Sequence, residues 1–330
     1  MANSLYSSVI RGLGSYVPTG RLSNADLEQM VETSDEWIVA RTGISERGIA
    51  SADEATSDFA YEAAKQAIEN AGLTPQDIDA IIVGTCTPDY PFPSVASLIQ
   101  HRLGCPQVTS FDVSNACVGF VSCLEIADQF VRTGLKKNVL VVGADTMSRI
   151  TDYSDRGTCI LFSDGAGACV LSPAPDPYHL GVLCSQTHTD GELLKSLWVP
   201  GGGSRHPEPQ YPETKDKIVM EGNKIFKVAV TVMSQSIENN LRVSGYDKDD
   251  IDWLIPHQAN VRIMSAIAHN LNFPMDKVIN NIRFYGNNSS ATIPLAMHAA
   301  IREGKIQRGH KLMLTAFGGG LAWGSIFMEY

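Results

Sequence analysis

The sequence contains little charge, no long apolar run and no concentration of basic residues. Charged residues make up 19% of the 330 positions, against roughly 25% in an average soluble domain. No stretch approaches the roughly 18 apolar residues of a membrane helix. The first twenty residues also lack the basic and apolar regions of a signal peptide. We therefore expect a soluble cytoplasmic protein with a large core and no membrane partner.

The balance of charge excludes a second class of function. Acidic residues outnumber basic ones by 36 to 26, which leaves a net charge of −10 at pH 7. Binding to nucleic acid needs clustered Lys and Arg to neutralise phosphates. We therefore expect no nucleic-acid partner, and any acidic partner must bind a local basic patch.

The cysteines exclude two further kinds of site. There are seven, an odd number, and none has the close spacing of a zinc motif: Cys86, Cys105, Cys117, Cys123, Cys159, Cys169 and Cys184. This pattern is typical of reduced thiols in a cytoplasm. The sequence predicts neither a disulfide framework nor a metal site.

What the sequence does contain is an internal repeat. Residues 67–82 and 236–255 each carry Ile-Glu-Asn, a glycine turn and Asp-Ile-Asp before an apolar run, and the runs 138–145 and 311–318 lie 173 positions apart. The helix ends at 131–134 and 301–304 are offset by 170. We interpret the chain as two similar α/β halves, 1–175 and 176–330. Two unrelated α/β stretches are the alternative.

Short β-branched runs alternate with amphipathic segments in both halves. Runs at 81–83 and 139–142 predict strands, whereas 57–71 and 118–132 predict helices. Residues 200–217 fit neither period and predict an exposed loop.

The first candidate for chemistry is Cys117. An apolar strand end at 111–113 runs through small residues into a helix, which places the thiol at a helix N-terminus. Unpaired N–H groups and the helix dipole there favour the thiolate, so we expect a lowered pKa and a nucleophile. The alternative is a buried cysteine that acts as a small hydrophobic residue.

Three further motifs lie at comparable places. His257 follows the apolar run 253–255, where open α/β folds place reactive groups, and the offset of 170 maps Cys117 onto Asn287. Gly318, Gly319 and Gly320 have backbone N–H groups that suit an oxyanion hole. A structural histidine, an Asn-rich turn and close backbone packing are the respective alternatives.

Together these motifs resemble β-ketoacyl-acyl-carrier-protein synthase III, the initiating condensing enzyme of the thiolase superfamily. The resemblance covers nearly the whole chain and is carried by residues 34–44, the Cys117 segment, 155–158, 257–260, 286–287 and 317–320. It implies a dimer with the thiolase-like five-layered αβαβα fold, built by duplication of two similar halves. It also implies that acyl-CoA is a substrate and that no cofactor is needed.

The resemblance assigns the catalytic roles. Cys117 would take an acyl group from acyl-CoA, and His257 and Asn287 would hydrogen-bond the thioester oxygen of malonyl-acyl-carrier protein as it loses CO₂. A neutral His257 with its proton on Nε2 suits that role. The N–H groups of Cys117 and Gly319 would hold the tetrahedral oxyanion. This His–Asn pair differs from the two histidines of elongating enzymes and from the second cysteine of thiolases.

The resemblance also assigns binding residues. Coenzyme A would contact Trp37, Arg41, Thr42, Arg156, Asn223 and Asn260, and the carrier protein would dock on Arg262, Lys224 and Lys227. Phe92 of the partner subunit and Met147 would bound the acyl pocket. A bulky residue at position 92 favours short primers, so we expect acetyl-CoA. A paralogue that uses longer or branched primers and a non-catalytic scaffold are the alternatives.

Overall fold

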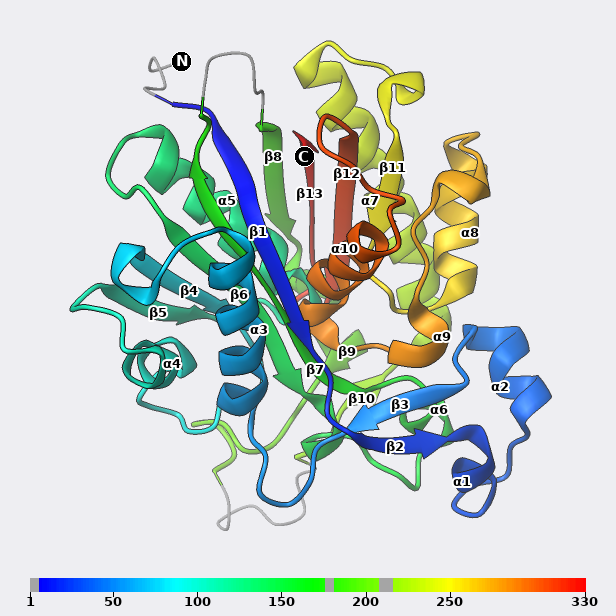
Figure 1. Ribbon diagram of the computed structural model, residues 1–330. Helices are drawn as coiled ribbons and strands as arrows, with labels where there is room; N and C mark the ends of the chain where they lie inside the picture. Colours follow the sequence, from blue (N-terminus) through cyan, green and yellow to red (C-terminus); the bar gives the residue numbers. More distant parts are fainter. Residues whose placement is uncertain (1–5, 176–180, 208–215) are drawn as a thin grey trace.

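The computed structural model describes residues 6–175, 181–207 and 216–330. Its first sheet has five strands in the order β1-β7-β6-β4-β5 (Figure 1). Strand β4 is parallel to both neighbours, whereas β7 is antiparallel to β1 and β6. The strands are β1 (Ser8–Tyr16), β4 (Ala80–Gly84), β5 (Thr109–Val113), β6 (Val139–Thr146) and β7 (Asp164–Pro173).

The second sheet repeats this arrangement with four strands in the order β8-β13-β12-β11, and with the same relative directions. They are β8 (Val182–Thr189), β11 (Trp253–Pro256), β12 (Lys311–Gly318) and β13 (Ala322–Glu329). The place of β5 is taken by a single bridge between Leu254 and Val278. The two halves therefore share one topology but differ at one edge.

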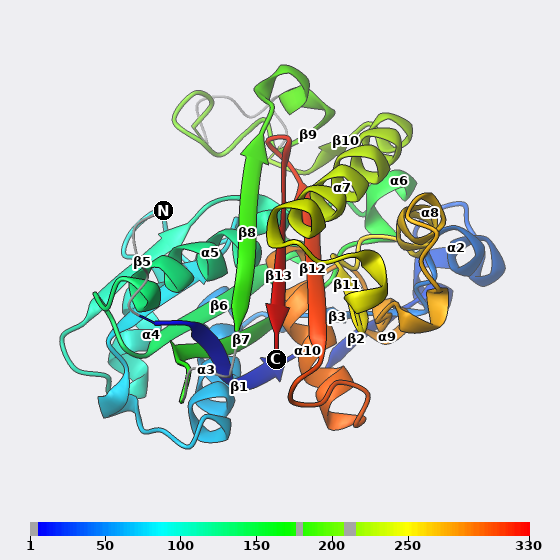
Figure 2. The same cartoon turned by 90° about the horizontal axis from the view of Figure 1, so that it is seen from above.

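Helices form three layers around these two sheets (Figures 1 and 2). Helices α3 (Thr56–Asn70) and α4 (Val95–Leu103) cover the outer face of the first sheet, and α7 (Gly222–Ser244) that of the second, with α8 (Val261–Asn270) beside α7. Helices α5 (Gly119–Arg132) and α10 (Thr292–Arg302) lie between the sheets. The order is α, β, α, β, α, which confirms the predicted five-layered fold.

Each contact between layers is an apolar core. One core lies between the sheets around α5 and α10, one joins α3 to the first sheet, and one joins α7 and α8 to the second. Strand β6 is buried along its whole length because both of its faces are covered. This explains its continuous apolar run rather than an alternating one.

The offset between the two halves at the turns before α5 and α10 differs from the one expected. Short 3₁₀ turns at Ala116–Val118 and Ser289–Ala291 precede α5 and α10, 173 positions apart, and each begins at a residue with positive φ, 41° and 52°. Helix α5 has 14 residues and α10 has 11, so the offset falls to 170 only at the helix ends. The counterpart of Cys117 is thus Ser290, and the mapping onto Asn287 was wrong.

A segment of the first half packs on the second. Strands β2 (Gly20–Ser23) and β3 (Glu46–Ile49) form a hairpin-like pair around α1 (Asn24–Glu28) and α2 (Asp35–Thr42). Helix α2 contacts α8, and Leu27, Ile38 and Ile44 join the core of the second half. The remaining short elements are α6 (Arg156–Cys159), α9 (Ile282–Tyr285), β9 (Leu197–Trp198) and β10 (Val219–Met220).

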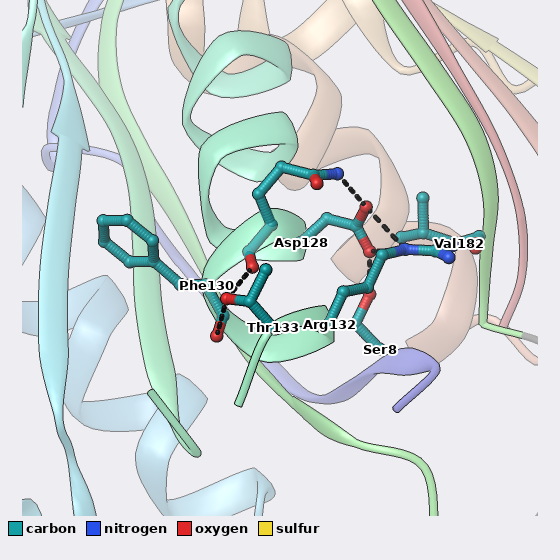
Figure 3. Close-up of polar contacts among 7 residues, drawn as sticks. Ser8, Asp128, Phe130, Arg132, Thr133 and Val182 are labelled. Atoms are coloured by element: carbon teal, nitrogen blue, oxygen red, sulfur yellow. Dashed lines mark hydrogen bonds and ion pairs between the residues drawn. The ribbon is translucent and has the colours of Figure 1, made fainter. Parts of the chain in front are cut away.

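A buried ion pair also ties the two sheets together (Figure 3). Arg132 Nε donates to Asp128 one turn earlier on α5, at 2.8 Å. The same arginine donates to the carbonyl of Val182 on β8, and Ser8 on β1 donates to Asp128. The end of α5 is therefore fixed to one strand of each sheet.

The predicted helices 57–71 and 118–132 are confirmed as α3, which lies one residue earlier, and α5, which begins one residue later. Residues 200–207 form neither helix nor strand, while 208–215 of the predicted loop lie outside the described residues. The boundary at 175/176 stays a prediction, because 176–180 also lie outside them. None of the described helices is long and apolar enough to cross a membrane.

Candidate active site

Cys117, His257 and Asn287 line one cavity of about 280 Å³. They come from three separate places: the 3₁₀ turn before α5, the residue after β11, and the second residue after α9. All three are buried, with exposed fractions of 9%, 3% and 5%. The fold thus brings together the three side chains that the motifs singled out.

The backbone packs closely around Cys117. A Cβ atom on Gly318 would lie 2.9 Å from both the Cβ and the N of Cys117, so only glycine fits there. Burial raises the pKa of the Cys117 thiol to about 12; a hydrogen bond from Ser289 lowers it, and the Asp145 charge raises it. The expected lowering by the helix N-terminus was therefore wrong for the free protein, because removal of the thiolate from water costs more than the dipole returns.

His257 is held at both its backbone and its ring. Its N–H donates to the carbonyl of Thr315 on β12 at 2.7 Å, which fixes the residue beyond the end of β11. Its Nδ1 lies 2.6 Å from Thr292 Oγ1 at the start of α10. Burial lowers the pKa of His257 to about 3, so the ring is neutral at neutral pH.

The amide of Asn287 has a fixed orientation. Its Oδ1 accepts from the N–H of Ser289 at 2.9 Å, which leaves Nδ2 as the donor that faces the cavity. Its backbone N–H donates to Leu161 O, and its carbonyl accepts from Ser163 N–H, each at 3.0 Å. Gly286 has a φ of 62° and sits against Ser163, where a side chain would clash.

The buried carboxylate of Asp145 connects the segment after β4 to the turn before α10. Asp145 is fully buried, and its two oxygens accept from Thr85, Cys86 and Thr87 on one side and from the N–H and Oγ of Ser290 on the other. Ser290, the counterpart of Cys117 in the repeat, is therefore held in a buried hydrogen-bond network. Of these two equivalent positions, only Cys117 lines the cavity described above.

The wide end of the cavity carries several of the residues expected to bind coenzyme A. Trp37, Arg41, Thr42, Asn223 and Asn260 line it. The guanidinium groups of Arg41 and Arg156 lie 4.5 and 4.7 Å from the centre of the Trp37 ring. Arg156 therefore occupies one face of Trp37, and an adenine could enter between them only if Arg156 moved aside.

The residues expected to dock the carrier lie beside this opening. Arg262 lines the cavity and contacts the Phe226 ring, whereas Lys224 and Lys227 are exposed on α7 and do not line it. Lys224 lies 3.8 Å from Glu221, so part of its charge is already balanced.

A second cavity of about 340 Å³ is also lined by Cys117, and most of its other lining side chains are apolar. Met147, which was expected to bound an acyl pocket, lines it together with Cys86, Ile150, Leu194, Trp198 and Ile218. Phe92 lines neither cavity of its own chain and is 85% exposed. Gly319 also lines this second cavity, beside Cys117 and Ala116.

Sequence analysis did not identify four residues at this site. Phe162 lines both cavities, Asp145 accepts hydrogen bonds from Ser290 and from the segment after β4, Ser289 orients Asn287, and Thr292 contacts His257. Only the Asn-rich turn that contains Ser289 gave any signal. The other contacts join segments far apart in sequence.

Comparisons with known proteins agree with this geometry. Two family models match: 3-oxoacyl-[acyl-carrier-protein (ACP)] synthase III over residues 111–191 and its C-terminal domain over 241–330. The chain is 48% identical over 333 aligned residues to the beta-ketoacyl-[acyl-carrier-protein] synthase III of Xanthomonas euvesicatoria pv. vesicatoria (strain 85-10), with 100% of both covered. It is also 48% identical to the protein of that name from Alkalilimnicola ehrlichii (strain ATCC BAA-1101 / DSM 17681 / MLHE-1), with 98% of this chain and 99% of that one covered.

A solved structure gives the same result. The crystal structure of 3-oxoacyl-[acyl-carrier-protein] synthase III from Aquifex aeolicus VF5 superposes with a TM-score of 0.91 at 44% identity, and covers 98% of this chain and 100% of that one. Three observations agree: the sequence identity over the full chain, the shared fold, and the meeting of Cys117, His257 and Asn287 in one cavity. The chain belongs to the β-ketoacyl-[acyl-carrier-protein] synthase III family of condensing enzymes.

Proposed function

We propose that the chain starts fatty-acid synthesis by condensing a short acyl group, acetyl in the first instance, with malonyl-acyl-carrier protein. The observation that carries the proposal is the meeting of a thiol, a neutral imidazole and an oriented amide in one buried cavity. A thiol supplies the nucleophile, and two neutral donors suit an enolate oxygen. Acyl-CoA enters as a substrate, and no resident cofactor takes part.

In the first half-reaction, the sulfur of Cys117 attacks the thioester carbonyl of acyl-CoA. A new C–S bond forms, the bond to coenzyme A breaks, and the thiol proton leaves with the released coenzyme A. The N–H groups of Cys117 and Gly319 hold the oxyanion of the tetrahedral intermediate. The acyl chain lies in the second cavity, against Met147.

In the second half-reaction, malonyl-carrier loses CO₂, and the electron pair of the broken C–C bond moves onto the thioester oxygen. His257 and Asn287 donate hydrogen bonds to that oxygen. The enolate carbon attacks the acyl group on Cys117, a C–C bond forms, and the C–S bond to Cys117 breaks. The sulfur regains a proton, and β-ketoacyl-carrier leaves.

We propose that the cavity mouth serves both substrates in turn. Trp37, Arg41, Thr42, Arg156, Asn223 and Asn260 bind coenzyme A, with the adenine against Trp37 once Arg156 has moved. Arg262, Lys224 and Lys227 form a basic island on an acidic protein, which favours an acidic carrier.

We also propose a cytoplasmic homodimer. All seven cysteines are unpaired, as in a reducing compartment. Strand β5 pairs with only one strand among the described residues and is one of the two edges of its sheet. Phe92 is exposed on the loop between β4 and α4, where a partner's acyl pocket would cover it. The longer-primer alternative is not favoured, because relatives with 48% identity over the full chain carry the name of the initiating enzyme.

Mass spectrometry of the intact protein tests the proposal. After incubation with acetyl-CoA, we expect one acetyl adduct that is lost when malonyl-carrier is added and acetoacetyl-carrier forms. Cys117→Ala should carry no adduct. Cys86→Ser is the matched control, because Cys86 lines the same second cavity, and it should still be acetylated.

An adduct that persists in Cys117→Ala, or its absence with every acyl-CoA tried, would contradict the proposal. Loading only by longer acyl-CoAs would retain the mechanism but replace acetyl as the primer.

A further inference from the structure

Thr292 is the side chain that contacts the ring of His257. Its Oγ1 lies 2.6 Å from Nδ1, well inside hydrogen-bond distance. Both residues are buried, with exposed fractions of 2% and 3%. The contact joins α10 to the residue after β11, so it depends on the relative placement of two elements.

The hydroxyl of Thr292 has one proton and two acceptors within reach. Nδ1 of His257 is at 2.6 Å, and the carbonyl oxygen of Ser289 is at 3.1 Å. A neutral imidazole carries its proton on one nitrogen only. If Thr292 donates to Nδ1, the ring proton must be on Nε2; if Thr292 donates to Ser289, Nδ1 carries the proton and Nε2 becomes an acceptor.

The geometry points to the first arrangement. The carbonyl oxygen of Ser289, at 3.1 Å, lies beyond the 2.5–3.0 Å of an ordinary O–H···O hydrogen bond, whereas Nδ1 lies at 2.6 Å. Nδ1 is therefore the better placed acceptor for the proton of this buried hydroxyl. His257 lines the cavity, and Nδ1 is taken by Thr292, so Nε2 is the nitrogen left to face a ligand.

We infer that Thr292 is a positioning residue that fixes His257 in the tautomer with its proton on Nε2. The hydroxyl donates to Nδ1 and so makes Nε2 a donor toward the cavity. Ser289 has the matching role for Asn287, since its N–H occupies Oδ1 and turns Nδ2 to the same cavity. One turn at the start of α10 therefore orients both donors. The catalytic meaning of the inference rests on the proposed function.

Histidine-selective ¹⁵N NMR tests the tautomer without any substrate. The His257 signal is assigned by its loss in His257→Asn. We expect an unprotonated Nδ1 and a protonated Nε2 in the wild type and in Thr292→Ser, which keeps the hydroxyl. Thr292→Val keeps the shape and removes the donor, so its ring should lose this preference. A wild-type signal with the proton on Nδ1 would overturn the inference, and this outcome needs no variant to fold.

Thr315→Val is the matched control. Thr315 is fully buried and its carbonyl binds the backbone N–H of His257, but its hydroxyl lies 3.3 Å from Gly324 O and is not bonded to the ring. Its removal should leave the tautomer of His257 unchanged. An unchanged tautomer in Thr292→Val as well would also overturn the inference.

The two half-reactions connect the tautomer to activity. In Thr292→Val we expect condensation to slow by about tenfold to a hundredfold, less than the roughly hundredfold to thousandfold loss when an oxyanion donor is removed outright, while acetylation of Cys117 changes less than twofold. Thr292→Ser should restore condensation. A changed tautomer with unchanged condensation would leave the inference standing and remove His257 from the proposed mechanism.

Discussion

At the scale of single residues, the nucleophile is also a core residue. Cys117 is nine-tenths buried, and its pKa of about 12 means that the resting group is a thiol. A thiolate is the form that attacks a thioester. Substrate binding must therefore help to form the thiolate of Cys117. Without substrate, the enzyme should react only slowly with thiol reagents.

Alkylation by iodoacetamide measures this directly. Because the thiolate fraction rises tenfold per pH unit below the pKa, the rate of Cys117 modification should rise by about tenfold per unit between pH 7 and 10, with no plateau. Rates are followed by mass spectrometry and compared with Cys117→Ser. A plateau near pH 7 would show that the helix N-terminus overcomes burial.

His257 gives a second prediction, on stability. Its folded pKa of about 3 lies below the 6.5 of an ordinary histidine, so unfolding takes up a proton in acid. The stability that this neutral histidine contributes is complete above pH 6.5 and is lost as the pH falls toward 3. Between pH 6 and 4 the wild type should lose on the order of 1 kcal/mol per pH unit more than His257→Gln. Urea unfolding at each pH measures the difference, and equal slopes would contradict the prediction.

Sequence analysis singled out Cys117, His257 and Asn287 because each stands in a short motif that precedes a helix. It could not identify Thr292, which lies 35 positions from His257 and meets it through the placement of α10. It also overestimated the helix dipole at Cys117, because burial is a property of the folded site. Local chemistry was predictable here, and contacts between elements were not.

At the scale of elements, the duplication is clearest in strand order and least exact in helix length. The common offset of 173 follows from apolar patterns that the sequence shows directly, whereas the strand order of the two sheets comes from the structure. The three-residue difference between α5 and α10 changes the register within the repeat. This is why a helix-end offset gave the wrong counterpart for Cys117. The internal repeat could not predict that α1 and α2, from the first half, pack on the second half.

The ion pair at the end of α5 should contribute more than a surface pair. Asp128 has a side-chain exposure of 3%, and burial raises its pKa despite Arg132. Arg132→Met would leave the carboxylate without its partner and remove the bond to β8, so we expect a loss of about 3–5 kcal/mol in the free energy of unfolding.

The exposed pair Arg102–Asp58, with side-chain exposures of 43% and 35%, is the control. Arg102→Met should cost less than about 1 kcal/mol. Denaturant unfolding of both variants at pH 7 compares them. Equal losses would mean that Arg132 does not join the two sheets energetically.

At the scale of the whole molecule, β5 is one of the two edge strands of the first sheet and pairs on one side only among the described residues. Edge strands are usually protected or paired. Strand β5 has no counterpart beside β11 beyond the bridge at Val278, so pairing through β5 is open to the first half alone. A twofold dimer formed there would bring the exposed Phe92 of each chain toward the other.

A substitution at Phe92 therefore tests both the proposed dimer and the preference for a short primer. Since the ring is 85% exposed and lines neither cavity of its own chain, any effect on primer length must act across subunits. In Phe92→Ala we expect kcat/KM for hexanoyl-CoA to rise at least tenfold relative to acetyl-CoA, with the dimer retained in sedimentation. A monomeric wild type, or an unchanged preference in a dimeric variant, would contradict this.

The two cavities that meet at Cys117 impose an order on events. The second cavity is the one proposed to hold the acyl chain, whereas the first cavity, lined by Trp37 and Arg262, is the approach proposed for both long substrates. A donor and an acceptor that share one entrance cannot occupy it together. In the proposed mechanism, the enzyme therefore alternates between two stable forms, empty and acylated. The covalent bond at Cys117 keeps the first acyl group in place after coenzyme A has left and until the second substrate binds.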